Sequence, residues 1–264
     1  MRRRQFLAGT VATTAVAALG STPEQTESAS PRDFYLIRRY TLRSGPQLKL
    51  TADYFSNALI PAVRRIGLGP VGAFRLDFGP ETPAYLLLIP GPSTAALAEV
   101  DLRLRNDAEF LREAEPFWSA PAAEPAFVRV ESSLLAAFQG WPKLTPPFPE
   151  SNKGKRIFQL RTYESPSERD HVRKVEMFHS GEFEIFKAAG FRPVFFGDTL
   201  IGTRMPNLTY MLAFTDMAEL EAKWDVFRND PAWKKLSSDP RFAFEPIVDT
   251  ITNLVLSPLD CSQI

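Results

Sequence analysis

The sequence has 264 residues, enough for one large domain or two small ones that each bury a core. Lys and Arg together number 31, as do Asp and Glu, so the chain is formally neutral, and no basic block suggests nucleic-acid binding. The single cysteine, Cys261, excludes an intramolecular disulfide and a cysteine-based zinc site, and with 2 histidines any metal site would depend on carboxylates.

The first 20 residues have the pattern of a targeting segment. Arginines at positions 2 to 4 precede a mildly apolar run that ends at Leu19. The order Arg3-Arg4-Gln5-Phe6-Leu7 resembles a twin-arginine export signal, although Arg2 stands where Ser or Thr is usual. A membrane anchor is the alternative, but the run is too short to favour a stable transmembrane span. We therefore predict a signal peptide at 1–20, removed on export to the periplasm or the outside of a bacterium.

The segment 21–33 is polar and aperiodic, and it predicts a disordered linker. A first domain is then predicted over 34–139. Alternation and helical spacing predict its elements in the following order: strand 34–42, helix 48–66 with a kink at Pro61, strands 71–77 and 84–89, helix 94–104, a short helical piece to 114, and strand 126–138.

The segment 140–155 contains several prolines and glycines, and it predicts a linker between domains. A second domain, 156–264, repeats the same order with clearer signals. Its predicted elements are strand 156–164, helix 167–189 ended by Gly190, strands 193–201 and 208–214, helix 216–227, a short helix through 231–236 and strand 247–256.

The two segments align at an offset of 123 residues, the difference between Arg38 and Arg161. The same offset matches Tyr40 with Tyr163, Gly67 with Gly190, Leu97 with Leu220, and Arg105-Asn106-Asp107 with Arg228-Asn229-Asp230. A constant offset with a constant element order indicates a tandem duplication of a ferredoxin-like β-α-β-β-α-β unit. Packing the two units sheet to sheet buries the apolar face that each would leave uncovered. The predicted fold class is therefore α+β.

Several segments of the second half are distinctive: Arg161-Thr162-Tyr163, Pro193-Val194-Phe195-Phe196-Gly197, Leu200-Ile201-Gly202, Pro206-Asn207-Leu208-Thr209-Tyr210 and Asp230-Pro231-Ala232-Trp233. Over nearly its whole length this half resembles the NIPSNAP family, whereas the first half is similar only in outline. The resemblance implies the fold of the dimeric α+β barrels, which include small monooxygenases and haem enzymes. It brings no catalytic residues with it.

The helix of the second half predicts a candidate site. Helical spacing gives an inward stripe of Val172, Val175, Phe178/His179, Glu182, Ile185/Phe186 and Ala189. His179 and Glu182 would then lie one turn apart, and a buried pair of this kind can transfer a proton. The alternative is a helix phase displaced by one position, which would leave Glu182 solvated and His179 half-buried.

The neighbouring strand places Gln159, Arg161 and Tyr163 on one face. A buried arginine on a sheet is suited to binding a carboxylate or a carbonyl group, but it is equally suited to a structural ion pair. Tyr210, Asp198 and Trp224 are candidates to complete a pocket between the sheet and the helices. At the offset of 123, Trp224 corresponds to Asp101 and His179 to Ser56, which predicts a pocket only in the second half.

Two functions remain open from the sequence. The first is an exported barrel that binds a small ligand or a protein partner, with Gln159, Arg161, Tyr210 and Trp224 as binding residues. The second is a cofactor-independent monooxygenase-like enzyme with His179, Glu182 and Tyr163 as catalytic candidates. Haem with His179 as its axial ligand is a more distant alternative, since the G-x-x-D-G signature of dye-decolorising peroxidases is absent, as are dinucleotide and phosphate-binding loops. No metal is predicted, and a homo-oligomer is possible.

Overall fold

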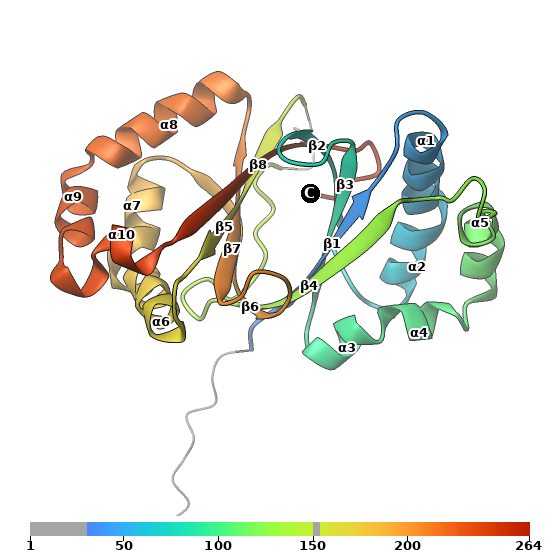
Figure 1. Ribbon diagram of the computed structural model, residues 1–264, viewed down its shortest axis with the longest axis horizontal. Coiled ribbons are helices and arrows are strands. Elements are labelled where there is room, and N and C mark those ends of the chain that lie inside the picture. Colours follow the sequence, from blue (N-terminus) through green and yellow to red (C-terminus); the bar gives the residue numbers. More distant parts are fainter. Residues whose placement is uncertain (1–30, 150–153) are drawn as a thin grey trace, which may run out of the picture.

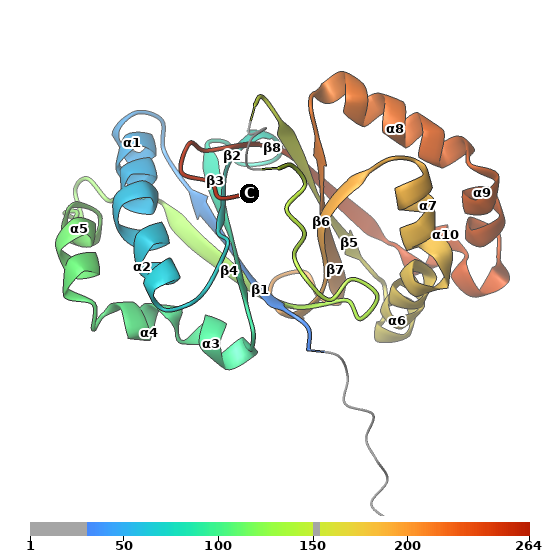
Figure 2. The ribbon, with the colours of Figure 1, turned by 180° about the vertical axis from the view of Figure 1, so that it is seen from behind.

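The computed structural model describes residues 31–149 and 154–264, so the predicted signal peptide lies outside the described residues. In these residues eight strands form one closed antiparallel barrel in the order β1-β3-β2-β8-β5-β7-β6-β4. Helices of the first half cover one side of the barrel and helices of the second half cover the opposite side (Figures 1 and 2). The fold is therefore an α+β barrel, as the sequence predicts.

The first half begins with a strand and a long helix and ends with a strand. Its elements are β1 (Phe34–Thr41), α1 (Pro46–Asp53), the π-helical turn η1 (Tyr54–Leu59), α2 (Ile60–Arg65), β2 (Gly72–Phe78), β3 (Ala84–Gly91), α3 (Thr94–Ala98), α4 (Val100–Leu104), α5 (Ala108–Trp118) and β4 (Arg129–Ala137).

The second half repeats this order and adds short helices before its last strand. Its elements are β5 (Ile157–Glu164), α6 (Glu168–Met177), the π-helical turn η3 (Phe178–Glu182), α7 (Phe183–Ala188), β6 (Arg192–Ile201), β7 (Asn207–Phe214), α8 (Met217–Asn229), α9 (Pro231–Ser237), the 3₁₀ turn η4 (Pro240–Phe242), α10 (Phe244–Ile247) and β8 (Thr250–Pro258). The predicted strand 247–256 therefore starts too early, because α10 occupies the residues before Asp249.

Both halves have the same internal strand order, β4-β1-β3-β2 in the first and β8-β5-β7-β6 in the second. The barrel closes through pairing between the halves, β2 with β8 and β4 with β6. Backbone details repeat as well. Glu81, between β2 and β3, and Arg204, between β6 and β7, correspond at the offset of 123, and both have a φ of 57°.

Alternation along the strands divides the side chains between two environments. The inner faces form the barrel core, with large members such as Tyr35, Phe74, Phe158 and Phe195. The outer faces pack under the helices, where each half has a cluster of its own. Residues Leu144 and Phe148 of the predicted linker also pack against the barrel core.

Each long helix is interrupted by a π-helical turn at the same place, η1 in the first half and η3 in the second. The extra residue in a π turn rotates the following helix relative to a continuous α-helix. Before η3 the inward residues are His171, Lys174 and Met177, within it they are Phe178 and Glu182, and after it they are Ile185 and Phe186. The predicted stripe is wrong by one position before the turn and correct after it. Within the turn Phe178 and Glu182 are buried as predicted, but His179 is exposed.

Candidate functional site

A cavity of about 390 Å³ lies against the outer face of β5, between this strand and the helices α8 and α9. Figure 1 shows this region on the side of the barrel that carries the second half. The cavity is lined by Gln159, Arg161, Tyr163, Glu182, Leu220, Glu221, Trp224, Phe227, Arg228, Trp233, Ile251 and Asn253. Five residues singled out from the sequence therefore come together: Gln159, Arg161, Tyr163, Glu182 and Trp224.

Arg161 is one of two arginines that line this cavity, the other being Arg228. Its guanidinium lies over the ring of Trp224 at 4.5 Å and donates a hydrogen bond of 3.1 Å to the Tyr163 hydroxyl. Within residues 31–149 and 154–264, no hydrogen-bond partner is found for its Nε and no carboxylate forms an ion pair with it. A stacked aromatic ring covers the face of a guanidinium but leaves its N–H edge available to an acceptor in the plane.

The Tyr163 hydroxyl connects Arg161 to a second tyrosine. It lies 2.8 Å from the hydroxyl of Tyr210, which is fully buried behind the cavity wall. Burial raises the pKa of Tyr210 well above its ordinary value, against the opposing effect of the Arg161 charge, so this hydroxyl stays protonated. The three groups form a continuous hydrogen-bonded chain from the buried wall to the cavity.

Gln159 fixes the position of Trp224. The indole Nε1–H donates to Gln159 Oε1 at 2.7 Å, and Gln159 Nε2 donates to Asn253 Oδ1 at 2.9 Å. The two bonds leave the indole no freedom to rotate away from Arg161, because a buried N–H that loses its acceptor is costly. The ring over the guanidinium is therefore held by strands β5 and β8.

Glu182 reaches the cavity from η3 and is held by Lys174 on α6. The Lys174 Nζ lies 2.6 Å from Glu182 Oε2, and the two side chains are 0% and 2% exposed. Burial raises the pKa of Glu182 above its ordinary value, and the Lys174 ammonium opposes that rise. The sequence reasoning missed Lys174 because it assumed a continuous α-helix, although Gly181 within the helix is a signal of an irregular turn.

Two predicted positions are corrected by the structure. His179 is exposed and points to the linker: its Nδ1–H donates to the Val175 carbonyl at 2.9 Å, and its Nε2 accepts from the Gly140 N–H at 3.1 Å. The predicted pairing of His179 with Glu182 is therefore wrong, and His179 does not line the cavity. Asp198 is also absent from the lining and lies 2.7 Å from His171 Nε2.

The first half has a smaller counterpart cavity, about 260 Å³, beside Arg38, Tyr40 and Asp101. Most polar residues of the second-half site correspond to apolar or uncharged residues here. At the offset of 123, Gln159, Lys174, Glu182, Tyr210 and Asn253 correspond to Leu36, Thr51, Leu59, Leu87 and Val130, respectively. The arginine and the tyrosine are kept, but Arg38 forms an ion pair with Asp101. The polar site is thus a property of the second half.

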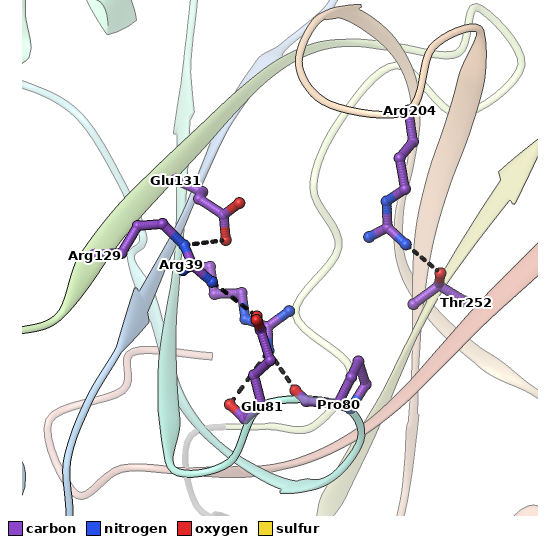
Figure 3. Close-up of polar contacts among 7 residues, drawn as sticks. All are labelled: Arg39, Pro80, Glu81, Arg129, Glu131, Arg204 and Thr252. Carbon is purple, nitrogen blue, oxygen red and sulfur yellow. Dashed lines mark hydrogen bonds and ion pairs between the residues drawn. The ribbon is translucent and has the colours of Figure 1, made fainter.

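Another cavity, about 560 Å³, opens at one end of the barrel (Figure 3). Its charged side chains form ion pairs with one another. Arg129 pairs with Glu81 at 2.9 Å and with Glu131 at 3.4 Å. Arg39 donates to the Pro80 carbonyl and Arg204 donates to Thr252 at 3.0 Å. Arg39 also lies 3.7 Å from Glu81, and Arg204 lies 3.4 Å from Glu164. Because each of these arginines has a carboxylate partner, this cavity offers a ligand less than the one beside Arg161.

The second half matches the model of a known family. Residues 158–263 match the NIPSNAP family model. The match covers the cavity and excludes the first half, and it confirms the resemblance that the sequence motifs indicate. No match was found among curated proteins.

Solved structures resemble the whole barrel, beyond the NIPSNAP region. The "putative monooxygenase" of Lactobacillus acidophilus has a TM-score of 0.56 at 9% identity, covering 86% of this chain and 94% of its own. A second "putative monooxygenase", from Fusobacterium nucleatum, has a TM-score of 0.55 at 7% identity and covers 88% and 94%. An "anthrone oxidase-like protein" has a TM-score of 0.52 at 11% identity and covers 88% and 93%. At these identities the similarity establishes the fold.

Two further findings concern the described residues alone. No helix among them is long and apolar enough to cross a membrane. No group of three or more His, Cys, Asp or Glu side chains among them is placed to hold a metal ion.

Proposed function

We propose that this protein binds a small molecule in the cavity between β5, α8 and α9. The observation that carries the proposal is the Arg161 guanidinium, which lines the cavity without a carboxylate partner among the described residues. The opposite walls are apolar, with Leu220, Phe227 and Trp233. A concave, largely apolar site with a few fixed polar groups is the usual form of a small-molecule site.

A variant that blocks the cavity tests this function. Ile251 lines the cavity and is 39% exposed, so Ile251→Trp adds bulk there without disturbing a packed core, and Ile251→Ala is the matched control. Native mass spectrometry of the protein from its own host is expected to show a bound mass in wild type and in Ile251→Ala but not in Ile251→Trp. A bare chain in all three, together with no compound that stabilises wild type in a small-molecule thermal-shift screen, would reject the function.

A second candidate is a cofactor-independent monooxygenase, and Glu182 favours it. Its carboxylate lines the cavity, and burial raises its pKa, which makes the ionised group a stronger base. In such a reaction Glu182 would accept a proton from an activated C–H bond, and the resulting carbanion would react with O₂. One oxygen atom becomes the product carbonyl and the other leaves as water. Structural neighbours described as monooxygenases and as anthrone oxidase-like support this alternative.

Oxygen consumption with anthrone as the probe separates the two candidates. An oxygenase is expected to consume one O₂ per anthrone, with turnover at least about a hundredfold lower in Glu182→Gln, the loss typical of a general base. A binding protein would show the same background consumption in wild type and in the variant.

We also propose export by the twin-arginine route, on the basis of Arg3-Arg4-Gln5-Phe6-Leu7. A reporter fused after residue 33 is expected to reach the periplasm with the wild-type segment. It should remain in the cytoplasm with Arg3→Lys and Arg4→Lys together, whereas export of that double variant would contradict the proposal.

A further inference from the structure

We propose that the ligand of the second-half cavity carries a carboxylate, which binds Arg161 in the way that Asp101 binds Arg38 in the first half. This inference rests on the proposed binding function and names the chemical class of the ligand. The duplicated architecture provides the argument, because one half contains an internal carboxylate at a position where the other half is open.

In the first half, Arg38 and Asp101 form a two-pronged contact. Arg38 Nη1 lies 2.9 Å from Asp101 Oδ1, and Nη2 lies 2.9 Å from Oδ2. Parallel bonds of this kind are specific to planar carboxylate-like groups. The Arg38 side chain is 10% exposed and that of Asp101 is 51% exposed, so the carboxylate reaches inward from α4 to a largely buried cation.

In the second half, the strand position of the arginine and its neighbouring tyrosine are kept, but the internal carboxylate is replaced. Arg161 occupies the equivalent place on β5 and has the equivalent tyrosine, Tyr163, two residues later. The position of Asp101 is taken by Trp224, which stacks on the guanidinium. Arg161 lines the cavity, and its Nε is buried without a hydrogen-bond partner among the described residues.

A largely buried arginine is stable as a cation only with acceptors nearby. Asp101 fills this role for Arg38, whereas Arg161 has the Tyr163 hydroxyl and the ring of Trp224. The Glu182 carboxylate also interacts with the Arg161 charge, but it is already paired with Lys174 at 2.6 Å. An incoming carboxylate would complete the same set of contacts. The body of the ligand would lie against Leu220, Phe227 and Trp233, which suits an aromatic or other flat apolar group.

A pair of probes with equal shape and different charge tests the inference. Binding of 4-fluorobenzoate and of 4-fluorobenzamide is measured by ¹⁹F NMR titration of the folded chain. Wild type is expected to bind the benzoate at least about tenfold more tightly than the benzamide, the difference expected for a charge-assisted pair of hydrogen bonds.

Two variants each remove one positive charge, from different parts of the cavity. Arg161→Gln is expected to weaken benzoate binding at least about tenfold and to leave benzamide binding within about twofold. Arg228→Gln is the matched control, because Arg228 lines the same cavity but is exposed and paired with Asp225. It should leave both affinities nearly unchanged.

The first half supplies an independent readout. Asp101→Ala removes the internal carboxylate, and because Asp101 is half-exposed the fold should tolerate the change. This variant is expected to bind a second equivalent of 4-fluorobenzoate beside Arg38. If Asp101→Ala binds no second equivalent, the comparison between the two halves no longer supports a carboxylate ligand.

The outcomes separate the two proposals. If both probes bind equally and Ile251→Trp abolishes both, the binding function stands and the carboxylate inference is rejected. If benzoate binding is equally sensitive to Arg161→Gln and Arg228→Gln, the attraction is a general charge effect and the inference is again rejected. If neither probe nor any screened compound binds, the proposed function itself is rejected.

Discussion

Lys174 and Glu182 form an ion pair with 2.6 Å between Nζ and Oε2, and the two side chains are almost completely buried. The equivalent residues of the first half are Thr51 and Leu59, so the barrel can be built without this pair. An ion pair in such surroundings costs desolvation energy that its attraction only partly offsets. The pair places a carboxylate in the cavity wall.

Breaking this pair should be more harmful than replacing it. Glu182→Leu leaves Lys174 buried without the carboxylate and is expected to reduce the free energy of unfolding by about 3–5 kcal/mol. Adding Lys174→Met should recover most of that loss, since two well-packed apolar side chains often match a buried ion pair. Urea denaturation followed by circular dichroism measures both. A double variant no more stable than Glu182→Leu would contradict this account.

Gly181 allows the π-helical turn that presents Glu182. Its φ of 140° lies in a region that side chains with a Cβ rarely adopt, although the space beside it is open. Gly181→Ala should therefore cost about 1–3 kcal/mol through backbone strain. Ser180→Ala, at the exposed neighbour, should stay within about 0.5 kcal/mol of wild type. Equal melting temperatures for the two variants would show that the turn does not depend on glycine.

Glu219 makes the stability of α8, the helix that carries Trp224, depend on pH in the acidic range. Partial burial raises the pKa of Glu219, but hydrogen bonds from Lys223, Thr215 and Arg192 outweigh it and lower the pKa from 4.5 to about 2. Because the pKa is lower in the folded state, the stabilisation is present above pH 4.5 and is lost as the pH falls towards 2. Unfolding free energies across this range should fall more steeply for wild type than for Glu219→Gln, and parallel curves would disprove the contribution.

His179→Ala should leave ligand binding unchanged. His179 is exposed and its two hydrogen bonds join α6 to the linker at Gly140, away from the cavity lining. The expected cost is about 1 kcal/mol of stability, the usual contribution of such bonds. Native mass spectrometry should find the same bound mass as in wild type, and loss of that mass would restore His179 as a site residue.

Much of the candidate site follows from strand alternation. Gln159, Arg161 and Tyr163 share a face of β5 in the sequence and in the structure, because a strand has a fixed period of two. Trp224 lines the same cavity, whereas Tyr210 lies behind its wall and contacts the Tyr163 hydroxyl. The inward positions of the helix could not be predicted in the same way. The π-helical turn shifts the phase of the residues before it, so that Lys174, and not His179, is the partner of Glu182.

The α+β class, the repeated element order and the strand face that carries Arg161 can be predicted from local periodicity and from a constant offset between two segments. The pairing of β2 with β8 and of β4 with β6, and the neutralisation of each charge, depend on how distant segments pack together. Arg38 and Arg161 are indistinguishable as strand residues, yet one faces Asp101 and the other faces Trp224 over an open cavity. The difference comes from residues distant in sequence, whose positions are fixed only when helices pack on the sheet.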